Sequence, residues 1–199
     1  AGTGIGGGRL SRELAAGAPA AGSRLGTLGG AVAHGDPSSD WPVALVAANA
    51  IIETAGPAGK REIAAEEFFE DYLTTALKAG EMVSAALLPA EPEGAKGHYE
   101  KFARVHGDYA TLSVALVLAK IGSECSFVRI ALGAAGATPV RVAEAEACLL
   151  GSALEVDAGN FDRVNAVVRV SLPAFKGRTL GLQERGGDTQ VLQVDGDGV

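Results

Sequence analysis

Two short stretches of the chain carry residues that are suited to binding a polar ligand. The first, GTLGGAVAHGDPSSDWP at residues 26–42, contains the adjacent glycines Gly29 and Gly30 and, further on, Asp40. Glycine has no Cβ, so backbone N–H groups there can approach an anionic or polar ligand, and a carboxylate can accept a hydrogen bond from a ligand hydroxyl. We interpret the stretch as a ligand-binding loop, although a surface loop without a ligand would account for the same residues.

The second stretch, KFARVHGDYA at residues 101–110, places basic side chains beside an acid and an aromatic ring. These residues are Lys101, Arg104, His106, Asp108 and Tyr109. Such a group suits the edge of an electron-rich ring, because it offers hydrogen-bond donors, an acceptor and a flat apolar surface. Charged residues at a turn are also commonly only solvated, so this interpretation stays open.

Other chemistries find less support in the residues. The histidines His34, His98 and His106 are widely spaced and none has the spacing of a zinc site. No serine lies in a GxSxG sequence. Cys125 and Cys148 stand in apolar surroundings without a CxxC pattern, so we expect two buried, reduced thiols.

Composition and charge narrow the class of protein. With 199 residues, 47% of them hydrophobic, the chain can bury a core as one large domain or two small ones. A net charge of -7 argues against a nucleic-acid groove. The longest apolar run, at 112–119, is far below the ~20 residues of a membrane span. No secretory signal is visible, so we expect a cytoplasmic protein.

The elements that must position the first stretch follow it closely. Residues 41–50 predict a short helix with Asp40 as its N-cap. A strand at 50–55 enters a hairpin at 56–61, residues 61–77 combine a return strand with one or two helical turns, and 81–89 is a further strand ending at Pro89.

The second half predicts a sheet and one clear helix. We expect two strands within 99–119 separated at Gly107, although 112–119 could equally be a buried helix. Strand is preferred because 126–136 supplies an antiparallel partner. The clearest helix lies within residues 138–151: Thr138 and Pro139 precede it, Gly151 ends it, and Val142, Ala145 and Leu149 fall on one face. The order of elements indicates an α+β fold with an antiparallel sheet.

Both ends of the chain are harder to interpret. Residues 1–25 are rich in Gly and Ala without periodicity, and GTGIGGG at 2–8 has no strand before it to make a phosphate loop. Residues 164–175 could form one strand, and the polar end from 184 is expected to be loose.

The two stretches in this order, with FFEDYLTTALKAGEMVSAALLP between them and VRIALGAAGATPVRVAEAEACLLG after them, resemble the FAD-binding medium subunit of the molybdenum hydroxylases. This is the family of carbon monoxide dehydrogenase and xanthine dehydrogenase. The resemblance, from about Leu25 to about Gly151, implies a PCMH-type FAD-binding subdomain followed by a C-terminal antiparallel sheet packed with helices. It divides the chain into an irregular segment at 1–24, a second FAD-binding subdomain at 25–91, a C-terminal flavoprotein domain at 97–151 and a divergent tail at 152–199.

The resemblance also implies which residues bind FAD. The family's glycine loop looks like Thr27, Leu28, Gly29, Gly30 and Ala31, which would lie along the pyrophosphate or the ribityl chain. Its following aspartate looks like Asp40, its apolar residue near the isoalloxazine like Val83, its lysine at the flavin edge like Lys101, and its aromatic after GD like Tyr109. Without a flavin, Thr27 would simply cap a turn and Val83 would be strand core.

For function, the resemblance implies electron transfer and no catalysis on the organic substrate. Electrons would come from a molybdopterin-binding large subunit through an iron-sulfur small subunit to FAD and on to an external acceptor. Family members also carry an AGGxS-type glycine loop that has no match in residues 1–25, which implies a chain without the N-terminal FAD subdomain. The alternative is a flavin-free structural or docking fragment of such a subunit.

Overall fold

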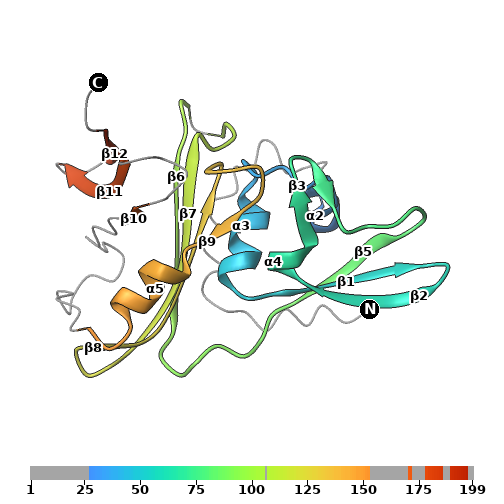
Figure 1. Cartoon of the computed structure of the whole chain (residues 1–199), viewed down its shortest axis with the longest axis horizontal. Coiled ribbons are helices and arrows are strands. Elements are labelled where there is room, and N and C mark those ends of the chain that lie inside the picture. The colour runs from blue at the N-terminus through green and yellow to red at the C-terminus, as the bar shows by residue number, and fades with distance from the viewer. Residues whose placement is uncertain (1–26, 106, 153–169, 172–177, 186–188, 197–199) are drawn as a thin grey trace.

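The computed structural model describes residues 27–105, 107–152, 170–171, 178–185 and 189–196, and it has the expected α+β fold (Figure 1). The first part of the described chain contains three helices and five strands. They are α2 (Leu28–His34), α3 (Asp40–Ala47), β1 (Ile51–Gly56), β2 (Gly59–Ala64), α4 (Ala65–Phe68), β3 (Phe69–Asp71), β4 (Thr74–Thr75) and β5 (Met82–Leu87).

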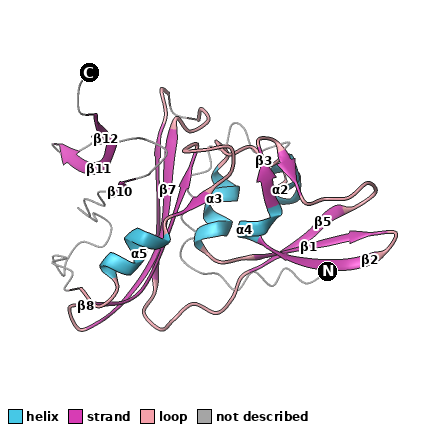
Figure 2. Cartoon of the chain, viewed as in Figure 1, coloured by secondary structure: helices cyan, strands magenta, loops and turns pink. Residues whose placement is uncertain are grey.

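The second part is dominated by longer strands, as Figure 2 shows. Its elements are β6 (Lys96–Phe102), β7 (Leu112–Ile121), β8 (Glu124–Gly133), β9 (Val140–Arg141) and α5 (Ala143–Leu149). Further along, β10 (Val170–Ser171), β11 (Arg178–Arg185) and β12 (Thr189–Gly196) form a separate antiparallel sheet. The prediction of a loose polar end is therefore wrong for β12, whose backbone pairs with β11 along its whole length.

The first sheet has the order β2-β1-β5 and is antiparallel throughout. Its β1–β2 hairpin closes at Gly59, whose φ of 104° belongs to the region that favours glycine. The predicted hairpin and the predicted strand at 81–89 are both confirmed. Residues 65–75 form one helical turn and the small β3–β4 hairpin, and that hairpin carries no clear signal in the sequence.

The second sheet has the order β6-β7-β8-β9. The open choice at 112–119 is settled in favour of a strand, β7, and every residue of that run is buried. The reason is that both faces of the sheet are covered, by α3 on one side and α5 on the other (Figure 1). A strand covered on both faces has no polar alternation, and this explains why its periodicity could not separate strand from helix.

Small side chains let α3 lie close against one face of this sheet. Ala115 and Ala131 are paired across β7 and β8 and are both fully buried in the same core as α3. Next to them, Ser113 pairs with Gly133, where an added Cβ would clash with Oγ of Ser113 and would lie 3.3 Å from Cβ of Val43. Glycine at 133 is thus required first by Ser113 on the neighbouring strand and second by the approach of α3.

The helix α3 is buried on nearly all sides, as an apolar helix between two layers must be. Its residues 42–47 are buried in one core that also contains Ile52 of β1 and Phe68 of α4. That core includes residues of both predicted domains, 25–91 and 97–151. The predicted N-cap is wrong: Ser39 occupies that position, and Asp40 is the first helical residue.

The helix α5 begins later than predicted, at Ala143 and not directly after Pro139. Residues 140–141 pair with β8 as the edge strand β9, and Val142 donates its N–H to Ile130 O at 2.9 Å. Val142 is therefore the N-cap, and the helix begins only at Ala143. The predicted apolar face is confirmed, since Val142, Ala145 and Leu149 pack together in the second core.

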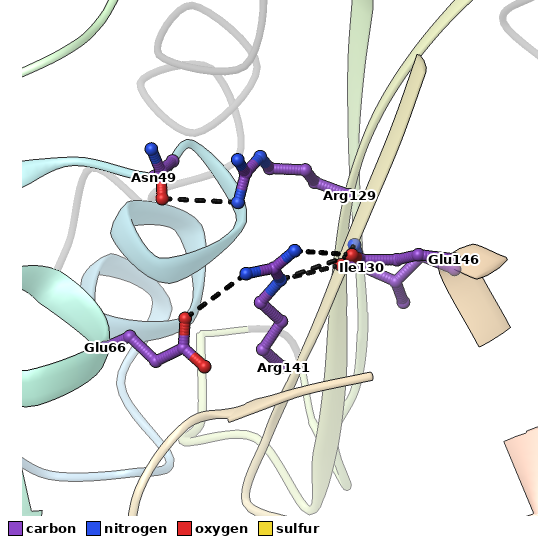
Figure 3. Close-up of polar contacts among 6 residues, drawn as sticks. All are labelled: Asn49, Glu66, Arg129, Ile130, Arg141 and Glu146. Carbon is purple, nitrogen blue, oxygen red and sulfur yellow. Dashed lines mark hydrogen bonds and ion pairs between the residues drawn. The ribbon is translucent and has the colours of Figure 1, made fainter. Parts of the chain in front are cut away.

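A buried carboxylate joins α5 to the edge of the second sheet (Figure 3). Glu146 accepts the N–H of Ile130 at 2.9 Å, just where β9 no longer covers β8, and it accepts from Arg141 Nη2 at 2.8 Å. Arg141 also lies 3.5 Å from Glu66 of α4, and Arg129 donates to Asn49 after α3 at 3.2 Å. These contacts tie the first part of the chain to the second sheet.

One prediction about the cysteines fails. Cys125 is buried, as predicted, whereas Cys148 of α5 is exposed. Within the described part of the chain, no helix combines the length and the apolar character needed to cross a membrane.

Candidate functional site

Residues 28–34 of the first conspicuous stretch form the helix α2 and not the loop that we predicted. Thr27 is the N-cap of α2, and its Oγ1 accepts the N–H of Gly30 at 3.0 Å. Gly35 ends the helix in the left-handed conformation with φ 66°. The expectation that Thr27 could serve as a cap is confirmed, although it caps a helix rather than a turn. Two glycines do not prevent the helix because Val32 anchors it in the core.

The glycines of α2 bring it close to β5. An added Cβ at Gly29 would lie 3.4 Å from the carbonyl oxygen of Val83, so the helix and the strand are in contact at that point. At Gly30 it would lie 3.0 Å from Oγ1 of Thr27 and would crowd the cap. The structure therefore brings residues 27–31 together with Val83, and both glycines have a packing reason of their own.

An ion pair fixes the start of β5. Glu81 accepts from Arg61 of β2 through two bonds, Nε to Oε1 at 2.9 Å and Nη2 to Oε2 at 2.6 Å, and from the N–H of Lys78 at 2.9 Å. These donors, the guanidinium first and the backbone N–H second, lower the pKa of Glu81 from 4.5 to about 2. The pair holds the strand that carries Val83 in its register.

Asp40 and Lys101 meet at the junction of α3 and the second sheet. Lys101 Nζ lies 3.2 Å from Oδ2 of Asp40, and the hydroxyl of Tyr99 donates to Oδ1 at 2.5 Å. Both side chains of the ion pair are about four-fifths buried. The carboxylate of Asp40 accepts hydrogen bonds from these two side chains and not from the first backbone N–H groups of α3, so it does not cap that helix. The result is a largely buried cluster of one acid, one cation and one phenol.

Tyr99 is the residue of this cluster that the sequence interpretation missed. Its signal is present in the sequence, because it stands two residues before Lys101 in a predicted strand, and residues at i and i+2 point to the same face. Burial and the neighbouring Asp40 carboxylate raise the pKa of Tyr99, so its hydroxyl keeps its proton and acts as a donor.

Tyr109 lies at the edge of this region and is largely exposed. The N–H of the next residue, Ala110, donates to Ser38 O at 3.2 Å, which places the end of the β6–β7 connection beside the segment that leads into α3. Arg104 lies 3.6 Å from Asp108 on the surface. The predicted participation of His106 lies outside the described residues. Among the residues that are described, no group of three His, Cys, Asp or Glu could hold a metal ion.

Two family models match the chain in succession. The FAD binding domain in molybdopterin dehydrogenase matches residues 8–91, and the CO dehydrogenase flavoprotein C-terminal domain matches residues 97–176. Together with the antiparallel sheet, they define an FAD-binding subunit, and the chain belongs to the family of FAD-binding medium subunits of the molybdenum hydroxylases.

Individual relatives support the same family. The carbon monoxide dehydrogenase medium chain of Afipia carboxidovorans is 37% identical over 155 residues, which are 77% of this chain and 53% of that protein. The nicotine 6-hydroxylase medium subunit of Paenarthrobacter nicotinovorans is 42% identical over 65% of this chain and 45% of its own length. The chain thus spans about half the length of these curated relatives.

Solved structures agree with the fold. Carbon monoxide dehydrogenase from Hydrogenophaga pseudoflava, in a form that lacks the Mo-pyranopterin moiety, matches with a TM-score of 0.62 and 40% identity. Quinoline 2-oxidoreductase from Pseudomonas putida 86 matches with a TM-score of 0.60 and 32% identity. Each comparison covers 65% of this chain and 45% of the other.

The side chains of the cluster fit the cofactor of this family. The pyrimidine edge of a flavin alternates carbonyl oxygens with an N–H group, so it needs both donors and an acceptor. Lys101 supplies a charged donor and Asp40 an acceptor, 3.2 Å apart. Their partial burial also makes each hydrogen bond stronger than it would be in water.

Proposed function

We propose that this chain is the FAD-carrying part of a molybdenum hydroxylase and passes electrons from iron-sulfur clusters to an external acceptor. The observation that carries the proposal is the largely buried cluster of Asp40, Lys101 and Tyr99, at the junction of two segments that match the two successive domains of a flavoprotein subunit. The flavin supplies the redox chemistry when it is bound.

The residues of this chain would hold and polarise the cofactor. Lys101 and Asp40 would bind the pyrimidine edge, where the ammonium stabilises the negative charge that a reduced ring acquires. Val83 would lie near the isoalloxazine, and residues 27–31 along the ribityl chain or the pyrophosphate, as the first turn of a helix offers N–H groups without intrahelical acceptors. Tyr109 would cover the ring from the connection between β6 and β7.

We also propose the partners and the compartment of the chain. A molybdopterin-binding large subunit would oxidise the substrate, and an iron-sulfur small subunit would deliver the electrons. The support is that relatives at 37% and 42% identity are named as the medium chain or medium subunit of carbon monoxide dehydrogenase and nicotine 6-hydroxylase. A cytoplasmic location agrees with two free cysteines, which persist in reducing compartments.

The visible absorption spectrum of the purified chain, recorded alone and after co-expression with large and small subunits, tests the proposal. We expect the bands of an oxidised flavin in the assembled protein and their bleaching when the substrate of the large subunit is added. A complex that assembles without a flavin would instead favour a docking fragment.

A further inference from the structure

The hydroxyl of Tyr99 is a hydrogen-bond donor for which the proposed function has no assigned role. Tyr99 and Lys101 are two residues apart on β6 and point to the same face of the second sheet. Asp40, in the first turn of α3, lies against that face. Each donates to one oxygen of the Asp40 carboxylate: the Tyr99 hydroxyl to Oδ1 at 2.5 Å, and Lys101 Nζ to Oδ2 at 3.2 Å. The orientation of the carboxylate is thereby determined by two donors from one strand.

The position of the hydroxyl is in turn determined by the core. The ring of Tyr99 packs against the core that contains Ala115, its partner across β6 and β7, and Val43 of α3. Burial and the carboxylate keep the phenol protonated, as its raised pKa indicates. A group held in this way cannot exchange protons with a substrate near neutral pH, so it can only donate its hydrogen bond.

We propose that Tyr99 is a positioning residue of the flavin site, which holds Oδ1 of Asp40 so that Lys101 and Asp40 present a fixed pair of charges to the pyrimidine edge. The proposal rests on the proposed function, because it assigns Tyr99 a role only if a flavin lies against that pair. Tyr99 itself need not touch the cofactor, and its effect is transmitted through the carboxylate.

The sign of this effect follows from electrostatics. The hydrogen bond from Tyr99 draws negative charge on Asp40 towards Oδ1 and away from Lys101. Without it, the carboxylate would pair more strongly with the ammonium and its own charge would be less compensated, so the site would favour the anionic reduced flavin less. Loss of the hydroxyl should therefore lower the flavin reduction potential, and a stronger phenol donor should raise it.

The test uses Tyr99→Phe in the assembled complex, with Tyr72→Phe as the control. Phenylalanine keeps the ring in the core and removes only the donor, and Tyr72 is 62% exposed on the β3–β4 turn. The flavin is titrated against a redox dye. At a fixed poise we expect the ratio of reduced to oxidised flavin to fall in Tyr99→Phe and to stay at the wild-type value in Tyr72→Phe. The fall should not exceed about tenfold, the value of one whole hydrogen bond, because the bond to Asp40 is present in both redox states and only its difference in strength counts.

Two further proteins separate positioning from packing. In an Asp40→Asn background, Tyr99→Phe should change the ratio by much less, because the charge through which it acts is gone. Site-specific 3-fluorotyrosine at position 99 keeps the fold and is the stronger donor, so it should raise the ratio. If Tyr99→Phe does not assemble, the fluorotyrosine protein decides alone.

The outcomes for the two proposals are distinct. A wild-type complex without flavin overturns the proposed function and the role of Tyr99 together. A wild-type complex that binds flavin, with the same ratio in the Tyr99→Phe and fluorotyrosine proteins, overturns the role of Tyr99 and leaves the proposed function intact. The role of Tyr99 is also overturned if Tyr99→Phe changes the ratio of reduced to oxidised flavin equally with and without the Asp40→Asn substitution.

Discussion

Asp40 and Lys101 are 61 residues apart in the sequence and form an ion pair of 3.2 Å at the junction of α3 and the second sheet. One residue comes from the segment that matches an FAD binding domain and the other from the segment that matches a flavoprotein C-terminal domain. The pair therefore connects both halves of the proposed flavin site, and its integrity should be visible in the behaviour of the cofactor.

Replacing Lys101 by methionine should weaken flavin binding, because the charged donor at the pyrimidine edge is lost while Asp40 stays. We expect flavin occupancy at subsaturating FAD to fall about tenfold or more, the factor for one charged hydrogen bond of about 1.5 kcal/mol. Flavin content after gel filtration of the complex measures it. Lys60→Met removes an exposed ion pair with Glu53 and should leave the content unchanged. Equal flavin content in both variants would exclude a role for Lys101.

Gly133→Ala should destabilise the protein, because the new methyl group meets Oγ of Ser113, Pro37 O at 3.2 Å and Val43. We expect a loss of about 1–3 kcal/mol in the free energy of unfolding, typical of overpacking in a core, measured by urea denaturation. In Gly136→Ala the methyl group lies 3.5 Å from its nearest neighbour, so stability should hardly change. A Ser113→Ala background should recover part of the loss, and no recovery would contradict the steric explanation.

Glu146→Gln should remove the charge of the carboxylate that joins α5 to β8. Burial opposes ionisation, but the bonds from Arg141 and the Ile130 N–H outweigh it, and the pKa of Glu146 is lowered. We expect a loss of about 3 kcal/mol at pH 7, as for a broken buried ion pair. Because the pKa of Glu146 is lowered in the folded state, the ionised carboxylate contributes its full stabilisation above the ordinary value of 4.5. This stabilisation is lost as pH falls below that value.

The pH dependence gives this prediction its control. The difference in unfolding free energy between wild type and Glu146→Gln should shrink as pH falls below 4.5. Glu144→Gln, on the exposed face of the same helix, should cost little at any pH. A difference between wild type and Glu146→Gln that does not vary with pH would show that the carboxylate charge is not what stabilises α5.

Glu81 should titrate far below an ordinary carboxyl group. Its pKa of about 2 depends on Arg61, so Arg61→Met should move the titration of Glu81 back towards 4.5. The stabilisation by Glu81 is complete above 4.5 and is lost between that value and about 2 as pH falls. Carbon-13 NMR of the side-chain carboxyl groups measures the pKa of Glu81 in the wild type and in Arg61→Met. As a control, the titration of Glu146 in the same spectra should not change between the two proteins. A Glu81 that titrates near 4.5 in the wild type would contradict the bidentate pair.

The sequence predicts best those elements whose signals are local. The hairpin of β1 and β2, strand β5 and the apolar face of α5 all follow from residues that are neighbours in the chain. The prediction of α2 as a loop failed because glycines are poor helix formers, and the helix forms only with Val32 in the core and with Thr27 as its cap. The start of α5 was misplaced because pairing of β9 with β8 competes with helix formation there.

By itself, the sequence determined the α+β class, the family and the two stretches that contain most residues of the proposed site. The tertiary structure decided which of them meet. Gly29 of α2 lies against Val83, Asp40 lies against Lys101, and Tyr99 completes the cluster. Contacts across 59 and 61 residues depend on how α3 packs on a sheet of small side chains, and no local pattern of residues encodes that packing.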